Sequence, residues 1–178
     1  MTAKKRSQFL MDHVYDSTRN RHYLNGASTV LHCHHYTTLV TQLAEDAVHF
    51  DGHRFLIEAA EECFYDVLGK YYQAYEIDSV EEKVAVAEDY WKLVGMGIIR
   101  FTSIGRYDVT AEMDYSHIDE GWLKKWGGHD KPVNFITAGF VAAVAALATN
   151  TVRRSFAVEQ TKALVCGDDV SAFRAIYR

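Results

Sequence analysis

The sequence predicts a single α+β domain in which N-terminal helices pack on a small antiparallel sheet. Helix-like patterns come first, a strand hairpin follows, and a further helix and two strands end the chain, which is an order typical of α+β folds. The chain has 178 residues, enough for one sizeable hydrophobic core. It contains one proline and no glycine- or serine-rich linker, repeat or low-complexity stretch that would divide it.

Residues 1–27 are polar, so we expect an irregular N-terminal arm with a short helix, followed by the folded domain over residues 28–178. Ser28 has the chemistry of an N-cap and predicts a first helix over residues 29–49. The second helix is expected over residues 52–73, after Asp51. Its apolar stripe includes Val67, Leu68, Tyr71 and Tyr72.

A third helix is expected from Asp78-Ser79 to about Val94, because Glu81 and Glu82 fit its first turn. Charged side chains of the second and third helices are assigned to their solvent faces (Glu58, Glu61, Glu62, Glu81, Glu82, Lys83, Glu88 and Asp89).

We predict a β-hairpin from residues 98–104, which are rich in β-branched side chains, and residues 108–115, which alternate in polarity. The segment 116–130 contains Trp122 and Trp126, followed by Gly127-Gly128. We interpret it as a loop packed by its own tryptophans, or as a lid over a pocket. A fourth helix, thin because it is rich in alanine, is expected from Pro132 to about residue 149, with strands over 155–165 and 172–177.

Composition excludes several functions. The net charge of −5 argues against a nucleic-acid-binding protein, and the basic run Lys4-Lys5-Arg6 is too short to provide affinity alone. The longest apolar run, residues 135–148, is shorter than the roughly 20 residues that cross a bilayer. Three well-separated cysteines and no signal peptide predict a cytoplasmic protein. Phosphate loops, nucleophile elbows, Cys-x-x-Cys pairs and His-Glu-x-x-His motifs are all missing from the sequence.

The run Leu31-His32-Cys33-His34-His35-Tyr36 is the most unusual polar cluster of the chain. On a helix, His32 shares a face with His35 and with Tyr36. If that face points to the core, its imidazoles could bond a phenol or carboxylate, or bind a metal, and Cys33 could act as a soft ligand or nucleophile. The alternative is that Cys33 packs as a small hydrophobe and the imidazoles bond backbone carbonyls.

The order of Gly95-Met96-Gly97, Pro132-Val133, Ala138-Gly139 and Cys166-Gly167-Asp168-Asp169 resembles the 4-vinyl-reductase-like, or hydrocarbon-binding, domain family. The resemblance covers residues 51–178 well. It implies a fold shared with haem-nitric-oxide sensors and TRAPP transport-complex subunits. It also implies binding of a small hydrophobic or aromatic molecule between the helices and the sheet. A homodimer, with helix 132–149 as a plausible contact, and a separate output or enzyme partner are further implications.

In many hydrocarbon-binding domains three cysteines and one glutamate bind a structural zinc. Here the glutamate is matched by Glu159, while Asn134, Lys162 and Ser171 stand at the cysteine positions. The resemblance therefore implies a dismantled metal site, and we expect Glu159 to pair with Lys162 instead.

These observations assign a ligand site and leave its chemistry open. The polar anchors are predicted to come from the cluster in the first helix, and the apolar wall from the third helix and the hairpin (His32, Cys33, His35 and Tyr36; Tyr90, Trp91 and Phe101). No cofactor is predicted. Two alternatives remain: an enzyme with a metal ion or haem at the His32–His35 cluster, where His32 and His35 would be the metal ligands, and a structural or assembly subunit.

Overall fold

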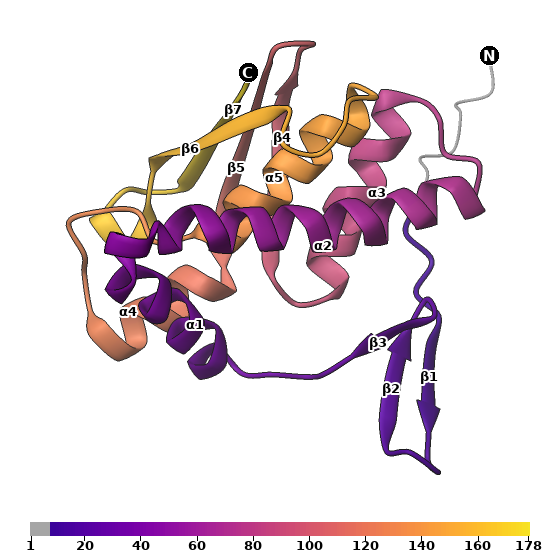
Figure 1. The fold of residues 1–178 in the computed structure, drawn as a ribbon, viewed down its shortest axis with the longest axis horizontal. Helices are drawn as coiled ribbons and strands as arrows, with labels where there is room; N and C mark the ends of the chain where they lie inside the picture. Colours follow the sequence, from indigo (N-terminus) through magenta and orange to yellow (C-terminus); the bar gives the residue numbers. More distant parts are fainter. Residues whose placement is uncertain (1–7) are drawn as a thin grey trace.

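A computed structural model describes residues 8–178 (Figure 1), so the basic run at residues 4–6 lies outside the described residues. It confirms the α+β fold class. The elements follow in the order β1 (His13–Asp16), β2 (Arg21–Leu24), β3 (Ala27–Thr29), α1 (His34–Asp46), the 3-10 turn η1 (Val48–Phe50), α2 (Gly52–Ala74), α3 (Val80–Leu93), β4 (Gly97–Ile104), β5 (Asp108–Ser116), α4 (His117–Trp126), α5 (Phe135–Ala148), β6 (Phe156–Lys162), the 3-10 turn η2 (Leu164–Cys166) and β7 (Ser171–Tyr177). Within the described residues, no helix has both the length and the apolar character needed to cross a membrane.

Four strands form the main antiparallel sheet in the order β4-β5-β7-β6. Alternate residues of β5 are buried (Val109, Ala111, Met113), so one face of the sheet packs on the helices. Helix α5 is the element that fills the centre, and its residues from Thr137 to Ala146 are all buried. The expectation that this small-residue helix forms a dimer contact is therefore wrong.

Helix α2 crosses α5 at Gly139 (Figure 1). A Cβ atom at Gly139 would lie 2.4 Å from the carbonyl oxygen of Ile57 and 2.6 Å from the Cβ of Ala60. The glycine is thus required by the closeness of the two backbones. The small alanine side chains of α5 also allow neighbouring elements to pack closely against it. This packing explains the alanine-rich pattern of residues 138–148.

The central core is aromatic. The rings of Trp91 and Phe140 stack with centroids 4.1 Å apart, and Phe64 meets Phe140 edge-on at 5.2 Å. Trp91 and Phe140 are fully buried. Part of the high aromatic content therefore forms a rigid core between the helices and the sheet.

The N-terminal arm is a three-stranded antiparallel sheet of β1, β2 and β3, and residues 8–27 contain no helix. Figure 1 shows this small sheet standing to one side of the helical body. Phe9 is the anchor of the arm: it is 6% exposed, and its ring lies 4.5 Å from that of Tyr71 and 5.2 Å from that of Tyr90. The backbone N–H of Leu10 also donates to the hydroxyl of Tyr71, at 2.7 Å.

Helix α1 begins at His34, five residues later than predicted, with Cys33 at the N-cap position. Ser28 cannot cap a helix because it pairs with Tyr23, and Thr29 with His22, in the β2–β3 ladder. The helix buries three threonines and one alanine (Thr37, Thr38, Thr41 and Ala44). The hydroxyls of Thr38 and Thr41 donate to the backbone carbonyls four residues earlier in the helix. These buried hydroxyls therefore need no hydrogen-bond partner from another element.

Tyr36, Leu39 and Leu43 lie on the exposed side of α1, with 59%, 48% and 57% of these residues exposed. The buried side of α1 packs on α4, where a Cβ at Gly121 would lie 2.7 Å from the hydroxyl of Thr38.

Helix α4 replaces most of the predicted loop over residues 116–130. Ser116 caps it by accepting from the backbone N–H of Asp119, and acidic residues open the helix while lysines close it, as its dipole favours. Only residues 127–130 of this segment remain a loop, so the interpretation of the whole segment as a loop is wrong.

Two charged side chains assigned to solvent are buried. Glu61 is 2% exposed and accepts bonds from the backbone N–H and the guanidinium of Arg154, at 2.7 and 2.6 Å. Lys83 is 8% exposed and donates to the carbonyl of Leu147 and the side chain of Asn150 at the end of α5. Both side chains thus tie a helix to the connection that follows α5.

Candidate functional site

The candidate site is a cavity of about 690 Å³ between the arm, α2 and α3. Its volume is in the range of small-molecule sites, roughly 300–1,000 Å³. The arm supplies one wall, including Phe9, Leu24 and residues 25–30, and the helices supply the other. The helical wall is aromatic and aliphatic (Val67, Tyr71, Ala74, Tyr75 and Tyr90).

Polar side chains also line the cavity, among them Tyr90, Cys63, Lys70 and Asp12. Burial, and then the neighbouring Cys63, raises the pKa of Tyr90 to about 12, so its phenol stays protonated and can donate a hydrogen bond. Burial, and then Asp66, raises the pKa of Cys63, which keeps that residue a thiol. Lys70 and Asp12 are the charged residues among those that line the cavity.

Of the predicted wall residues, only Tyr90 borders this cavity. Trp91 is fully buried in the core, and Phe101 packs against the same core cluster. Phe9, Tyr71 and Tyr75 were missed as site residues. The apolar stripe on the second helix contained Tyr71, but an arm taken as irregular gave no reason to expect a wall opposite it.

The predicted polar anchors lie elsewhere. His32, Cys33, His35 and Tyr36 are exposed at or just before the start of α1, and none of them lines the cavity. The rings of His32 and Tyr36 are 5.6 Å apart, and the Cys33 Sγ lies 3.9 Å from the His35 Nδ1. The condition that this face points to the core is therefore not met, since all four side chains are exposed.

The structure instead brings His32 and His34 to His117 at the start of α4, with ring centroids 5.9 and 6.2 Å away. Burial lowers the pKa of His117, and the neighbouring His32 and His34 lower it further. No sequence signal pointed to this convergence, since His117 was expected in a loop. Within residues 8–178, no group of three or more His, Cys, Asp or Glu side chains is arranged to bind a metal ion.

The positions matched to the zinc ligands of the hydrocarbon-binding family separate into two pairs. Asn134 and Ser171 are buried, and each bonds to the carboxylate of Asp119. Glu159 and Lys162 are exposed on β6, and no ion pair joins them in the described chain. The expected pairing of Glu159 with Lys162 is therefore wrong.

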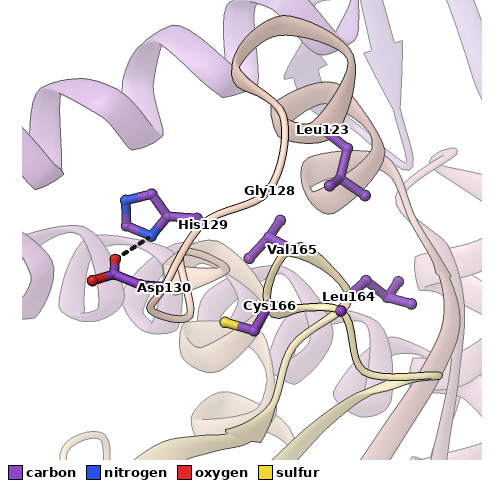
Figure 2. Close-up of a pocket in the computed structure, with 8 residues that line it drawn as sticks. Leu123, Gly128, His129, Asp130, Leu164, Val165 and Cys166 are labelled. Carbon is purple, nitrogen blue, oxygen red and sulfur yellow. Dashed lines mark ion pairs between the residues drawn. The ribbon is translucent and has the colours of Figure 1, made fainter.

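A second, shallower hollow of about 460 Å³ lies between the end of α4 and η2 (Figure 2). The His129 Nδ1 lies 3.6 Å from a carboxylate oxygen of Asp130, and Cys166 also lines the hollow. Burial raises the pKa of Cys166, as do the carboxylates of Asp168, Asp130 and Asp119. The thiol therefore stays protonated, which argues against nucleophilic chemistry here.

No family model matches the chain, and no curated protein matches it in sequence. Solved structures do. The phenol-responsive sensory domain of the transcription activator PoxR, crystallised with phenol, superposes with a TM-score of 0.73 at 10% identity. The match covers 93% of this chain and 84% of that one.

A trafficking protein particle complex subunit 3 from Naegleria fowleri, covalently bound to palmitic acid, superposes with a TM-score of 0.50 at 11% identity. The match covers 80% of this chain and 95% of that one. At these identities the likenesses establish the fold and nothing more. The chain thus shares its fold with a sensory domain and with a transport-complex subunit.

Proposed function

We propose that this chain is a binding domain, similar to the hydrocarbon-binding family, that captures a small hydrophobic or aromatic molecule in the cavity between the arm, α2 and α3. The observation that carries the proposal is that cavity, walled by Phe9, Tyr71, Tyr75 and Tyr90. The shared fold with a phenol-responsive sensory domain supports the same conclusion. The ligand is an organic molecule with a flat or aliphatic body, because the wall is mainly carbon.

The residues of the cavity have separate roles in this proposal. The ring faces of the four aromatic residues bury the apolar body of the ligand, which is the dominant favourable term. Tyr90 donates a hydrogen bond to a ligand oxygen from inside the wall. Lys70 offers a cation to an acidic ligand group at the cavity's edge. The protonated Cys63 thiol forms no covalent bond with the ligand.

The test is a calorimetric titration of phenol and 4-ethylphenol into the whole chain and into a Val67→Trp variant. Val67 lines the cavity on α2, so an indole there fills space that the ligand needs. We expect saturable binding to the wild type and at least tenfold weaker binding to the variant. A Leu39→Trp variant is the matched control, because Leu39 is exposed on α1 and lines no part of the cavity. Equal binding by all three proteins would reject the cavity as the site.

The metal- or haem-dependent alternative has only the approach of His32 and His34 to His117 behind it, and within residues 8–178 no such group is arranged to bind a metal ion. It predicts an absorbance band beyond that of the protein itself, which the alanine variant of His117 would lose. The assembly-subunit alternative predicts that partner binding is insensitive to changes at these histidines.

The dimer remains a proposal, and the α1 face is a better contact for a second copy than the buried α5. Tyr36, Leu39 and Leu43 project from that face, and Phe50 and Phe55 follow in the next elements with 79% and 55% of their surface exposed. Tyr36, Leu39 and Leu43 are three and four residues apart on one helix, and exposed apolar side chains that share a face mark association surfaces. A cytoplasmic location and a separate output partner complete the proposal.

A further inference from the structure

A buried polar cluster joins α4 to five other elements. Its centre is Asp119, which is 0% exposed in the first turn of α4. Five other residues reach it directly or through one neighbour, from β5, the start of α5, β6, η2 and β7 (Ser116, Asn134, Gln160, Leu164 and Ser171). Buried polar groups normally bond to one another, and the Asp119 Oδ2 does so, while its Oδ1 is buried without a hydrogen-bond partner among the described residues.

Asn134 uses every hydrogen-bonding atom of its side chain. Its Nδ2 donates to the Asp119 Oδ2 at 2.8 Å and to the Ser116 Oγ at 2.9 Å. Its Oδ1 accepts from the backbone N–H of Thr137 and so caps α5. These bonds fix the orientation of the amide, because a flip would turn its oxygen toward the carboxylate of Asp119.

Ser171 is saturated in the same way. Its hydroxyl donates to the Asp119 Oδ2 at 2.9 Å. It accepts from the Gln160 Nε2 at 3.2 Å and from the backbone N–H of Leu164 at 3.1 Å. One donor and two lone pairs are all that a hydroxyl has. The start of β7 is thereby tied to β6, η2 and α4 at once.

This donor set does not fit zinc. A structural zinc site uses four thiolate, imidazole or carboxylate ligands in a tetrahedron. Here Asp119 is the only acidic residue of the six-residue cluster, Asn134 presents N–H groups, and the hydroxyl of Ser171 is already saturated. A divalent cation at this point would be left with a buried net charge and without enough ligands.

We propose that the network around Asp119, Asn134 and Ser171 replaces the structural metal that the family resemblance implies, and fixes α4, α5, β6 and β7 to one another without it. Asp119 and Gln160 are members of this network that the resemblance does not match to any zinc ligand. Glu159 and Lys162, which it does match, lie outside the network on the exposed side of β6.

The test compares the thermal unfolding of two variants of the whole chain, Asn134→Ser and Ser171→Ala. Serine is a good N-cap, so Asn134→Ser keeps the cap of α5 and removes only the bonds from Nδ2. Each variant removes a donor to the buried carboxyl group of Asp119 and leaves other polar groups of the cluster without a partner. We therefore expect the Tm to fall by roughly 5–10 °C. The matched controls Glu159→Ala and Lys162→Ala should shift the Tm by less than about 2 °C.

Zinc supplies the second measurement. Chain purified from zinc-containing medium should carry far less than one zinc ion per chain by elemental analysis, and EDTA should leave its Tm unchanged. An unchanged Tm for Asn134→Ser would overturn the proposal, because the bonds from Nδ2 would then contribute nothing to holding the elements together. Stoichiometric zinc whose removal lowers the Tm would overturn it as well.

Discussion

Replacing Phe9 by alanine should release the arm from the helical body and open the proposed ligand cavity. Phe9 is almost fully buried and contacts Tyr71 and Tyr90. Truncating a buried phenylalanine costs roughly 3–5 kcal/mol. The hydrogen bond from Leu10 to Tyr71, at the same end of the arm, is worth about 1 kcal/mol. This loss is larger than the contribution of the remaining bond, and it shifts the equilibrium between the docked and released arm by roughly a hundredfold to a few thousandfold.

Hydrogen exchange is the assay, because it reads local opening separately from global unfolding. We expect amides of the arm sheet, residues 13–29, to lose protection relative to the body, while those of α5 keep theirs. Binding of phenol should weaken by at least tenfold. Phe55→Ala is the control, since Phe55 is 55% exposed and lines no part of the cavity.

The reasoning fails if the arm of Phe9→Ala exchanges as slowly as that of the wild type. It also fails if the arm opens while phenol binding is unchanged, because the arm would then be no wall of the site.

Three further predictions concern the rest of the fold. Glu61→Gln should lower the free energy of unfolding by roughly 1–3 kcal/mol in urea, because the bonded charge partner of Arg154 is lost; Glu62→Gln, 60% exposed, should have little effect. The pKa of His117 is lowered in the folded protein. The neutral imidazole therefore adds its full stability above pH 6.5, the ordinary pKa of histidine, and this stability is lost as the pH falls below 6.5. The Tm of the wild type should therefore fall below pH 6.5 more than that of His117→Gln, with His32, His34, Glu120 and Lys124 as the other charges that act on it. Leu39→Asp should convert a dimer to a monomer in sedimentation; a wild type that is already monomeric at micromolar concentration would disprove the α1 contact.

The parts of the fold that the sequence predicts well have local signals. Helices α2 and α3 begin within a residue of their predicted starts, because both have long apolar repeats and the Ser79 side chain caps α3, although the Asp51 side chain makes no cap bond to α2. The β4–β5 hairpin and the final strands follow from β-branched alternation and a short turn.

The parts that it predicts badly depend on partners distant in the chain. Ser28 has the chemistry of a cap, but pairing with Tyr23 commits it to a strand. Glu61 resembles a solvent-facing glutamate until Arg154, 93 residues away, is placed against it. The short α4 is stabilised by its cap and by contact with α1 at Gly121, and neither its length nor its apolar pattern distinguishes it from a loop.

The candidate site shows the same division. Tyr90 could be selected from the sequence because Tyr90 and Trp91 are adjacent aromatic residues on the third helix, and such residues face either the core or a ligand. The opposite wall could not, since it depends on an arm whose strands are short and whose anchor, Phe9, is a single aromatic residue in a polar stretch.

The most direct test of the cavity as the ligand site is the reaction rate of the Cys63 thiol with a bimane reagent, with and without phenol. Cys63 lines the cavity, and a Cys33→Ser/Cys166→Ser background leaves it as the only thiol of the three that the sequence contains. The account predicts that saturating phenol slows this reaction by at least tenfold. An unchanged rate at phenol concentrations that saturate binding would place the ligand elsewhere and contradict the account.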